Sequence, residues 1–270
     1  MARFLSKMHF RDRVAVVTGA ASGMGRALSW ELGRAGARLA LIDRDEAGLQ
    51  RLHEDLGQAG FRSAIAIVDV SDREALRSAI RNLTDELGPA EILIPCAGIC
   101  GFDLVEKLDV EQIEKILRVN YLGVIHALDA VLPGMIERHS GRIVALISMT
   151  AIRGIPFEAA YGASKAALQT FLESLRPALR RRGILVTLAY PGFVQTPLLE
   201  DLMQRGMARP PGVIDAETVA RAILAAARRG DRIVSVPRSL KVVVELGRLL
   251  PHFLYDHIMT RLARRFDLPY

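Results

Sequence analysis

The stretch RVAVVTGAASGMGRALSWELGR, residues 13–34, decides the fold of this chain. Residues 13–18 are almost continuously apolar, which is typical of a strand buried on both faces of a parallel sheet. A glycine-rich turn follows, and the residues from Arg26 to Arg34 have helical periodicity. Such a turn between a strand and a helix lets backbone N–H groups approach a pyrophosphate at the helix N-terminus. The turn residues that we expect to contact it are Gly19, Ser22, Gly23, Met24 and Gly25.

Strand and helix patterns alternate along the rest of the chain without an internal linker. The predicted strands lie near residues 13–18, 37–42, 63–68, 91–95, 142–147, 184–189 and 232–236. The segments between them, including a long helix from about Val110 to Arg138, predict right-handed crossovers and a doubly wound parallel sheet with helices on both faces. Ligands of such α/β folds bind at the carboxyl ends of the strands. We therefore expect one dinucleotide-binding and catalytic domain over residues 1–237.

The second predicted strand ends in Asp43, 24 residues after Gly19. An acidic side chain at this distance meets the adenosine ribose of a dinucleotide, where it binds both hydroxyls and repels a 2′-phosphate. Arg44 follows directly, and an arginine can pair with that phosphate. Because a flexible arginine can turn to solvent while the carboxylate stays, the sequence favours NAD over NADP.

Three reactive side chains lie in ISMTAIRGIPFEAAYGASK, residues 147–165. Tyr161 and Lys165 are four residues apart, so on a helix their side chains lie on one face. We expect the Lys165 ammonium to lower the pKa of the Tyr161 phenol from about 10, so that the phenol can act as a general base. Ser148 supplies a hydroxyl that can hold a carbonyl or alcohol oxygen. This set predicts proton transfer to or from an oxygen while a hydride moves at its carbon.

From about Arg13 to Val236, these motifs resemble those of the short-chain dehydrogenase/reductase family. The resemblance implies a Rossmann fold with strand order 3-2-1-4-5-6-7 and assembly as a homodimer or homotetramer. It implies that Ser148, Tyr161 and Lys165 are catalytic, that the latter two also contact the cofactor, and that Asn120 holds a proton-relay water. The further cofactor contacts that it implies are Asp69, Val70, Cys96, Ala97, Gly98, Pro191, Gly192, Val194 and Thr196.

One motif departs from the family pattern. Where the family has Asn-Asn-Ala-Gly after the fourth strand, this chain has Pro95, Cys96, Ala97 and Gly98. Pro95 has no N–H to donate at a strand end, and a cysteine cannot replace the two-sided hydrogen bonding of an amide. We expect a local effect on the sheet and on the geometry of the cofactor loop, with the catalytic residues intact.

The segment PLLEDLMQRGMARPPG, residues 197–212, has apolar residues at largely helical spacing. In the family this region forms a mobile lid, and leucine and methionine there suit a lipophilic substrate. A helix that packs its apolar side on the domain explains the pattern equally well. The substrate contacts that we expect are Ser148, Ile155, Phe157, Tyr161, Leu198, Leu202 and Met203, with Leu199 and Met207 in the same pattern.

Residues 238–270 form an extension beyond the minimal fold and contain six basic and three acidic residues. Apolar residues recur every three or four positions and predict two amphipathic helices broken near Pro251. Three roles stay open for them: capping the substrate cleft, extending an oligomer interface, or peripheral contact with an anionic membrane. The apolar positions are Val243, Leu246 and Leu250 in the first helix, and Leu254, Ile258, Leu262 and Phe266 in the second.

Composition disfavours other classes of protein. Half of the 270 residues are hydrophobic, enough for one sizeable core. Cys96 and Cys100 lack nearby partners for a metal site, and a chain without an export signal is expected in the reducing cytoplasm. The net charge of +6 comes from scattered arginines without interleaved aromatic residues, which argues against nucleic-acid binding. No apolar stretch reaches the roughly 18 residues expected of a membrane-spanning helix.

The leading expectation is therefore an NAD-dependent oxidoreductase that interconverts a lipophilic secondary alcohol and its ketone. Candidate substrates are steroids, fatty or acyl-chain compounds and cyclic alcohols. An NADPH-dependent ketone or 3-oxoacyl reductase is the nearest alternative. A dinucleotide-sensing interaction protein without turnover is the alternative from another class.

Overall fold

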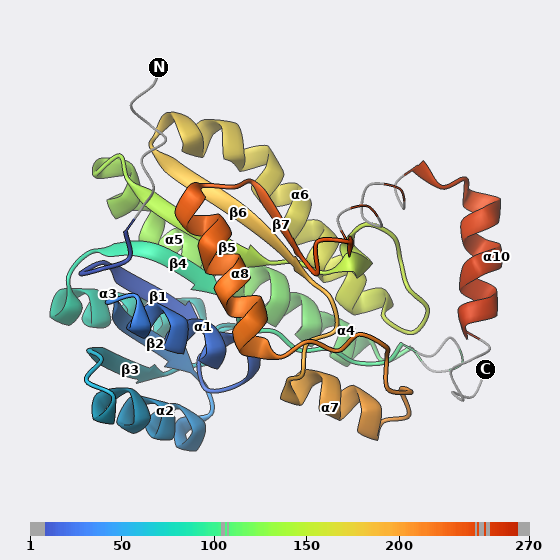
Figure 1. The fold of residues 1–270 in the computed structure, drawn as a ribbon, viewed down its shortest axis with the longest axis horizontal. Helices are drawn as coiled ribbons and strands as arrows, with labels where there is room; N and C mark the ends of the chain where they lie inside the picture. The colour runs from blue at the N-terminus through green and yellow to red at the C-terminus, as the bar shows by residue number, and fades with distance from the viewer. Residues whose placement is uncertain are drawn as a thin grey trace.

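The computed structural model describes residues 9–103, 106, 108–240, 242, 246 and 249–263, without the side chains of residues 262 and 263. Seven parallel strands form one sheet in the order β3-β2-β1-β4-β5-β6-β7, which confirms the predicted fold and strand order (Figure 1). The strands lie within one or two residues of the predicted ones, because burial on both faces gave them clear apolar patterns. They are β1 (Val14–Thr18), β2 (Arg38–Asp43), β3 (Ser63–Ile67), β4 (Ala90–Pro95), β5 (Gly141–Leu146), β6 (Ile184–Pro191) and β7 (Ile233–Val236).

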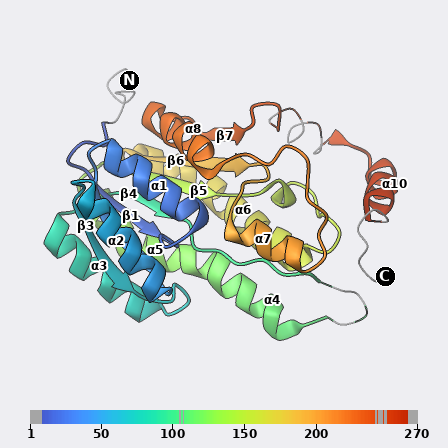
Figure 2. The ribbon, with the colours of Figure 1, turned by 60° about the horizontal axis from the view of Figure 1, so that its bottom comes forward.

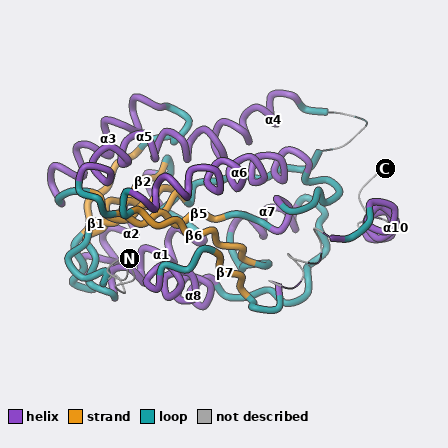
Figure 3. The backbone as a smooth tube through the Cα atoms, turned by 90° about the horizontal axis from the view of Figure 1, so that it is seen from above, coloured by secondary structure: helices purple, strands orange, loops and turns teal. Residues whose placement is uncertain are grey.

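Helices cover both faces of the sheet (Figure 3). Helices α1, α2 and α8 bury one face, and α3, α5 and α6 bury the other, so that two apolar cores lie on either side of the strands. The helices are α1 (Gly23–Arg34), α2 (Glu46–Gln58), α3 (Arg73–Leu87), α4 (Val110–Leu117), α5 (Gly123–Glu137), α6 (Ala159–Arg181), α7 (Pro197–Gln204), α8 (Ala216–Arg229) and α10 (His252–Ala263).

Several helices begin where the sequence offers a capping side chain. Asp45, Asp72 and Asp109 accept hydrogen bonds from backbone N–H groups in the first turns of α2, α3 and α4. Asp215 does the same for α8, and Thr196 for α7. Each cap satisfies an N–H that the helix cannot, which typically stabilises a helix by about 1 kcal/mol. The caps therefore fix where the crossover segments turn into helices above the strand ends.

The long helix predicted from about Val110 to Arg138 is not continuous. Residues Arg118–Leu122 form a π-helical turn between α4 and α5. The apolar pattern runs through this turn, so periodicity alone gave no sign of it. Wide turns of this kind are rare and occur mostly at functional sites. Here the turn contains Asn120, whose side chain is fully buried.

In the part of the chain that the structure describes, one helical segment is long and apolar enough to cross a membrane. It is Val110–Glu137, and the expectation that no stretch has this length and composition is wrong. Charged residues cluster in α4, and α5 has only Asp129 between its ends at Gly123 and Glu137. In the structure α5 packs on α3 and β4. The apolar side chains of this helix accordingly belong to the core under the sheet.

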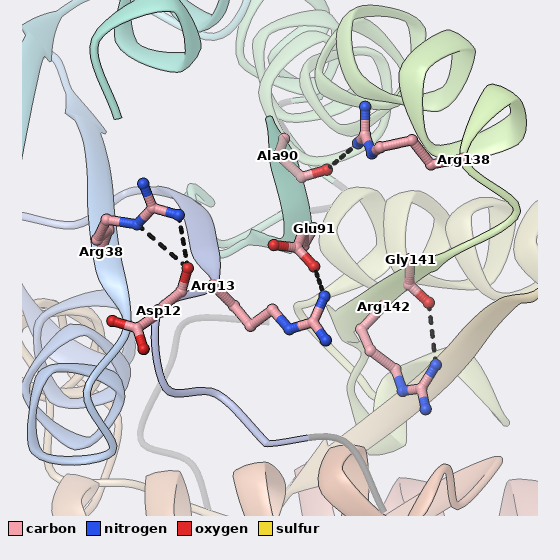
Figure 4. A network of polar contacts seen from close by, with 8 residues as sticks. All are labelled: Asp12, Arg13, Arg38, Ala90, Glu91, Arg138, Gly141 and Arg142. Carbon is pink, nitrogen blue, oxygen red and sulfur yellow. Dashed lines mark hydrogen bonds and ion pairs between the residues drawn. The ribbon is translucent and has the colours of Figure 1, made fainter. Parts of the chain in front are cut away.

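Arginine side chains join neighbouring strands at the amino end of the sheet (Figure 4). Arg13, directly before β1, pairs with Glu91 in β4. The Arg38 guanidinium donates to the Asp12 carbonyl at 2.6 and 3.2 Å, and Arg138 donates to the Ala90 carbonyl at 2.7 Å. These contacts give part of the positive charge a structural role.

The C-terminal extension is described only in part. Helix α10 lies at the end of the molecule where the strands finish, apart from the two helix layers (Figures 1 and 2). It contains Leu254 and Ile258 of the predicted second helix. Val243 and Phe266 lie outside the described residues, as does the side chain of Leu262.

Candidate active site

The three reactive side chains converge beyond the end of β5. Ser148 follows that strand and begins a short 3-10 turn, where its hydroxyl accepts from the Thr150 N–H at 3.2 Å. Tyr161 and Lys165 lie in the first two turns of α6, and the Lys165 ammonium is 5.8 Å from the centre of the Tyr161 ring. Ser148 and Tyr161 share a side-chain hydrogen bond. The structure thus brings together the set that the sequence predicts.

Burial dominates the titration of Tyr161 and Lys165. It raises the pKa of Tyr161 above its usual value, and the charge of Glu158 raises it further, while the hydrogen bond with Ser148 lowers it. Burial also lowers the pKa of Lys165 to about 8. The expectation that the pKa of Tyr161 is lowered is wrong for the protein alone, because the desolvation of the phenol dominates its pKa.

A backbone carbonyl at the end of β5 holds the Lys165 side chain in place. Its ammonium donates to the Leu146 carbonyl at the end of β5, at 3.0 Å, and its side chain is buried. A buried ammonium needs such acceptors, since an unpaired one would be costly. This contact fixes the position of the charge relative to Tyr161 one turn earlier in α6.

Asn120 joins the π-helical turn to the segment that follows β4. Its amide nitrogen donates to the Ile99 carbonyl at 2.8 Å and to the Ser164 hydroxyl at 3.0 Å, and its amide oxygen accepts from the Ile99 N–H at 2.8 Å. A Cβ atom at Gly98 would lie 3.4 Å from the Asn120 oxygen and 3.8 Å from the Lys165 nitrogen. Asn120 and Lys165 therefore meet over Gly98, while the proton-relay water expected for Asn120 stays a prediction.

The glycine turn after β1 has no room for side chains. Gly19 has a φ of +68°, and a Cβ there would lie 2.5 Å from the Ala97 nitrogen. A Cβ at Gly25 would lie 1.9 Å from the Gly19 carbonyl oxygen. Only glycine lets the two backbone segments come this close, which is the cradle that a dinucleotide pyrophosphate requires.

The N-terminus of α1 lies beside this turn. Ser22 is the residue before the helix, but its side chain makes no capping hydrogen bond, and no acidic residue lies in the first turn. Gly23 contacts Thr196, because a Cβ there would be 3.3 Å from the Thr196 side chain. Met24 is buried in the core below. A cavity of about 270 Å³ adjoins Gly23 and Pro197, so space is left beside the first turn of α1.

Backbone donors hold the Asp43 carboxylate at the end of β2. Its oxygens accept from the Ala21 N–H at 2.9 Å and from the Asp45 N–H at 3.0 Å. Arg44 pairs with Asp69 at 3.6 Å. The carboxylate therefore faces the glycine turn while the arginine does not bind there.

Asp69 and Val70 follow β3. Burial raises the pKa of Asp69, but hydrogen bonds from Ser71 and the charge of Arg44 outweigh it, and the net shift is downward. Asp69 is thus an anion over the physiological range. Val70 packs against the start of α5, where a Cβ at Gly123 would lie 2.7 Å from its side chain.

The unusual Pro95-Cys96 segment lies between the glycine turn and Lys165. Pro95 pairs with Thr18 of β1, whereas the recorded pairing of β4 with β5 ends at Leu93. Cys96 donates its N–H to the Thr18 carbonyl at 3.1 Å. Burial raises the pKa of the Cys96 thiol, and that of Cys100, to about 12, so both thiols stay protonated. The pairing of β4 with β5 stops before Pro95, which has no N–H to donate to a neighbouring strand.

The segment after β6 closes over the glycine turn. The Gly192 N–H donates to the Val236 carbonyl at 2.7 Å, and Val194 is buried. The Thr196 hydroxyl donates to the Val194 carbonyl at 3.2 Å and caps α7. Pro191 ends β6. These contacts place Thr196 against Gly23, as expected of a segment that covers a dinucleotide.

Helix α7 buries part of its apolar side. Leu202, together with Leu199 and Met207, packs with Cys100 and Phe102, and Met203 is partly buried against this cluster. Leu198 is exposed. Of the predicted substrate residues in α7, Leu202 therefore packs inside the protein, Met203 does so in part, and Leu198 faces solvent. Ile155 and Phe157 are half-buried before α6, and Phe157 has a φ of +69°, a conformation that side chains disfavour.

An acidic pair beside Tyr161 was not predicted from the sequence. The Asp103 carboxylate accepts from the Ala160 N–H at 2.8 Å and so caps α6 from a distant loop. Burial and the charge of Asp103 raise the pKa of Glu158, the residue before α6, to about 7. The position of Glu158 three residues before Tyr161 was the available signal. No signal in the sequence pointed to Asp103, because its contact with the Ala160 N–H depends on how the loop around residue 103 folds back to α6.

No group of three or more His, Cys, Asp or Glu side chains among the described residues is arranged to hold a metal ion. The candidate site contains a glycine cradle, the Asp43 carboxylate beside it, and the Ser148, Tyr161 and Lys165 set.

Comparisons with known proteins agree with this geometry. A family model described as short chain dehydrogenase matches residues 13–206. The chain belongs to the short-chain dehydrogenase/reductase family. An uncharacterised oxidoreductase of Myxococcus xanthus is 36% identical over 250 residues, which are 93% of this chain and 97% of that protein.

Solved structures of this family share the fold. A variant of the actinorhodin polyketide ketoreductase with NADPH superposes with a TM-score of 0.78 and 27% identity, over 83% of this chain and 95% of the other. A short-chain dehydrogenase/reductase from Burkholderia phymatum in complex with NAD gives a TM-score of 0.81 at 24% identity, over 97% and 99% of the two chains. The protein is thus a short-chain dehydrogenase/reductase enzyme with a dinucleotide-binding Rossmann fold.

Proposed function

We propose that this short-chain dehydrogenase/reductase is an NAD-dependent enzyme that interconverts a lipophilic secondary alcohol and its ketone. The observation that carries the proposal is the convergence of Ser148, Tyr161 and Lys165 beside the glycine cradle. A bound nicotinamide supplies the hydride acceptor or donor. The residues of the chain have to hold the substrate oxygen and move its proton.

Each residue has a role that follows from its contacts. In oxidation, the Tyr161 phenolate takes the hydroxyl proton of the alcohol, and in reduction the phenol gives it back. Ser148, hydrogen-bonded to Tyr161, orients the substrate oxygen. Lys165, held by the Leu146 carbonyl, supplies a positive charge near the phenol and a donor toward the cofactor. Asn120 keeps the segment around Ile99 and Gly98 in place.

The preference for NAD rests on Asp43. Its carboxylate is fixed by two backbone N–H groups beside the glycine turn, so it cannot turn away from a ribose 2′-phosphate. The fixed negative charge of Asp43 repels that phosphate, and the Arg44 guanidinium that could offset it is paired with Asp69. The competing candidate is an NADPH-dependent ketone reductase, which the similarity to the actinorhodin polyketide ketoreductase favours.

Apolar side chains support a lipophilic substrate. Ile155 and Phe157 precede Tyr161, and Met203 and Leu198 of α7 keep surface beyond the packed cluster. Assembly as a dimer or tetramer and a cytoplasmic location stay predictions.

Initial rates of NADH formation across lipophilic secondary alcohols test this function, beside the same series with NADP. Tyr161→Phe is expected to bind dinucleotide almost normally and to lose most turnover. A Phe variant with near-normal turnover would contradict the role of Tyr161. Higher kcat/KM with NADP than with NAD would favour the reductase candidate, and dinucleotide binding without turnover on any substrate would favour a sensing protein.

A further inference from the structure

We propose that the C-terminal segment around α10 binds an anionic membrane surface and holds the active-site loop against it. This inference concerns where the enzyme works and goes beyond the proposed reaction. It rests on the contacts of α10 with the loop, on the apolar side chains that the segment exposes, and on its charge.

Helix α10 is attached to the loop that precedes Tyr161. The Arg153 guanidinium lies 4.8 Å from the centre of the Tyr255 ring and contacts the His252 ring nitrogen at 3.2 Å. Arg153 also donates to the Leu250 carbonyl, and the Tyr255 hydroxyl donates to the Gly154 carbonyl. Arg153 and Gly154 lie between Ser148 and Tyr161 in the sequence. Whatever α10 binds is therefore connected to the wall of the active site.

The segment also exposes large apolar side chains among its polar ones. Leu249 is 79% exposed and Phe253 is 76% exposed. Val242, Leu246, Leu254 and Ile258 are exposed as well. Among the described helices and strands, none packs extensively on α10. So many large apolar side chains on one short segment mark an interaction surface rather than a solvated helix.

Further apolar residues lie at the same end of the molecule. Leu108 and Val110, just before and at the start of α4, are both exposed, and the start of α4 points toward the end where α10 lies (Figure 2). Phe193 and Leu198, after β6 and in α7, are exposed beyond the strand ends. Exposed apolar side chains thus occur on several elements at this end of the molecule, as expected for a protein face that rests on a lipid layer.

Charge decides between a membrane and a second copy of the chain. Residues 238–270 contain six basic and three acidic residues, a net charge of +3. In a two-fold dimer through this segment, each basic segment would face an identical one, and like charges would repel. An anionic lipid surface attracts them, and exposed Arg261 in α10 adds to this attraction. Apolar side chains with basic neighbours are the combination that binds such surfaces.

Co-sedimentation of the full chain with vesicles tests the proposal. The vesicles are phosphatidylcholine alone and an equal mixture of phosphatidylcholine and phosphatidylglycerol. We expect binding to the mixture, little binding to phosphatidylcholine alone, and weaker binding as salt is raised. Serine at both Leu249 and Phe253 should lower the partition coefficient by about tenfold or more, and Arg261→Glu should lower it by a smaller factor.

Matched controls change the same kinds of residue elsewhere. Ile67→Ser alters an exposed apolar residue on β3, at the opposite edge of the sheet, and Arg77→Glu alters an exposed arginine in α3. Both should bind vesicles like the unaltered protein. Melting curves of all variants show whether the fold is retained.

Three outcomes overturn the proposal. The first is an unaltered protein that does not sediment with the anionic vesicles. The second is a Leu249 and Phe253 double variant that binds as well as the unaltered protein. The third is a dimer, seen by light scattering without vesicle binding, that dissociates in the double variant, which would assign the surface to a second copy of the chain.

Discussion

Replacing Glu158 with Gln tests how a nearby charge sets the working range of Tyr161. Burial and Asp103 raise the pKa of Glu158 to about 7, so the carboxyl is neutral below that pH and charged above it. When charged, it raises the pKa of Tyr161. At an effective dielectric of about 20, like charges on side chains that face the same site interact by roughly 1 to 2 kcal/mol, or about one pH unit. Because both side chains are partly exposed, solvent reduces this to about half a unit to one unit.

The expected result has a definite sign. Oxidation requires the Tyr161 phenolate, so its rate rises with pH, and the rising limb of Glu158→Gln should lie about half to one pH unit lower. Below about pH 7 the two enzymes should agree, since Glu158 is neutral there. The assay is the pH profile of kcat for alcohol oxidation at saturating dinucleotide, with Glu86→Gln on α3 as control. A profile that does not move, or moves upward, would refute the electrostatic coupling of Glu158 to Tyr161.

Other predictions follow from contacts in and around the site. The pKa of Glu158 is higher in the folded protein than in the unfolded chain, so ionisation of Glu158 destabilises the fold as pH rises from about 4.5 to 7. Thermal melts should therefore show Glu158→Gln more stable than the unaltered protein by about 1–2 kcal/mol at pH 8, but not at pH 4. Gly19→Ala puts a Cβ 2.5 Å from the Ala97 nitrogen at a φ of +68°, and calorimetric titration should show dinucleotide affinity at least about tenfold lower. Asp43→Ala should lower the ratio of kcat/KM for NAD over NADP by about tenfold or more, because the repelling carboxylate is gone. Asp103→Ala removes the cap on α6, and urea denaturation should show a loss of about 1 kcal/mol.

The strands were predictable because burial on both faces leaves an apolar record in the sequence. Val14–Thr18, for example, is buried at every position and reads as a strand without any tertiary information. The glycine turn was predictable because close backbone approach requires glycine, and Gly19 and Gly25 lie at positions where a Cβ would overlap neighbouring backbone. The break at Arg118–Leu122 was not predictable, because a π-helical turn keeps the apolar character of the helix around it.

The convergence of Ser148, Tyr161 and Lys165 was predictable from the sequence, but the electrostatics around them were not. Spacing placed Tyr161 and Lys165 on one helix face, and the structure confirms this placement. Spacing carries no information on desolvation, so the direction of the pKa shift of Tyr161 was predicted wrongly. The contact of Arg153 with Tyr255 joins residues 102 positions apart and follows no local pattern. Such contacts depend on how the whole chain is folded.

The π-helical turn between α4 and α5 has a consequence for the tolerance of this region to insertions and deletions. One extra residue in a turn rotates everything after it by about 100° around the helix axis. Helix α4 packs on α6, whereas α5 packs on α3 and β4, so the rotation lets one continuous segment serve two neighbours. A single-residue deletion within Arg118–Leu122 would restore a regular helix and remove the rotation between α4 and α5. One of the two packing faces would then point to solvent, although every side chain outside the turn would be unchanged.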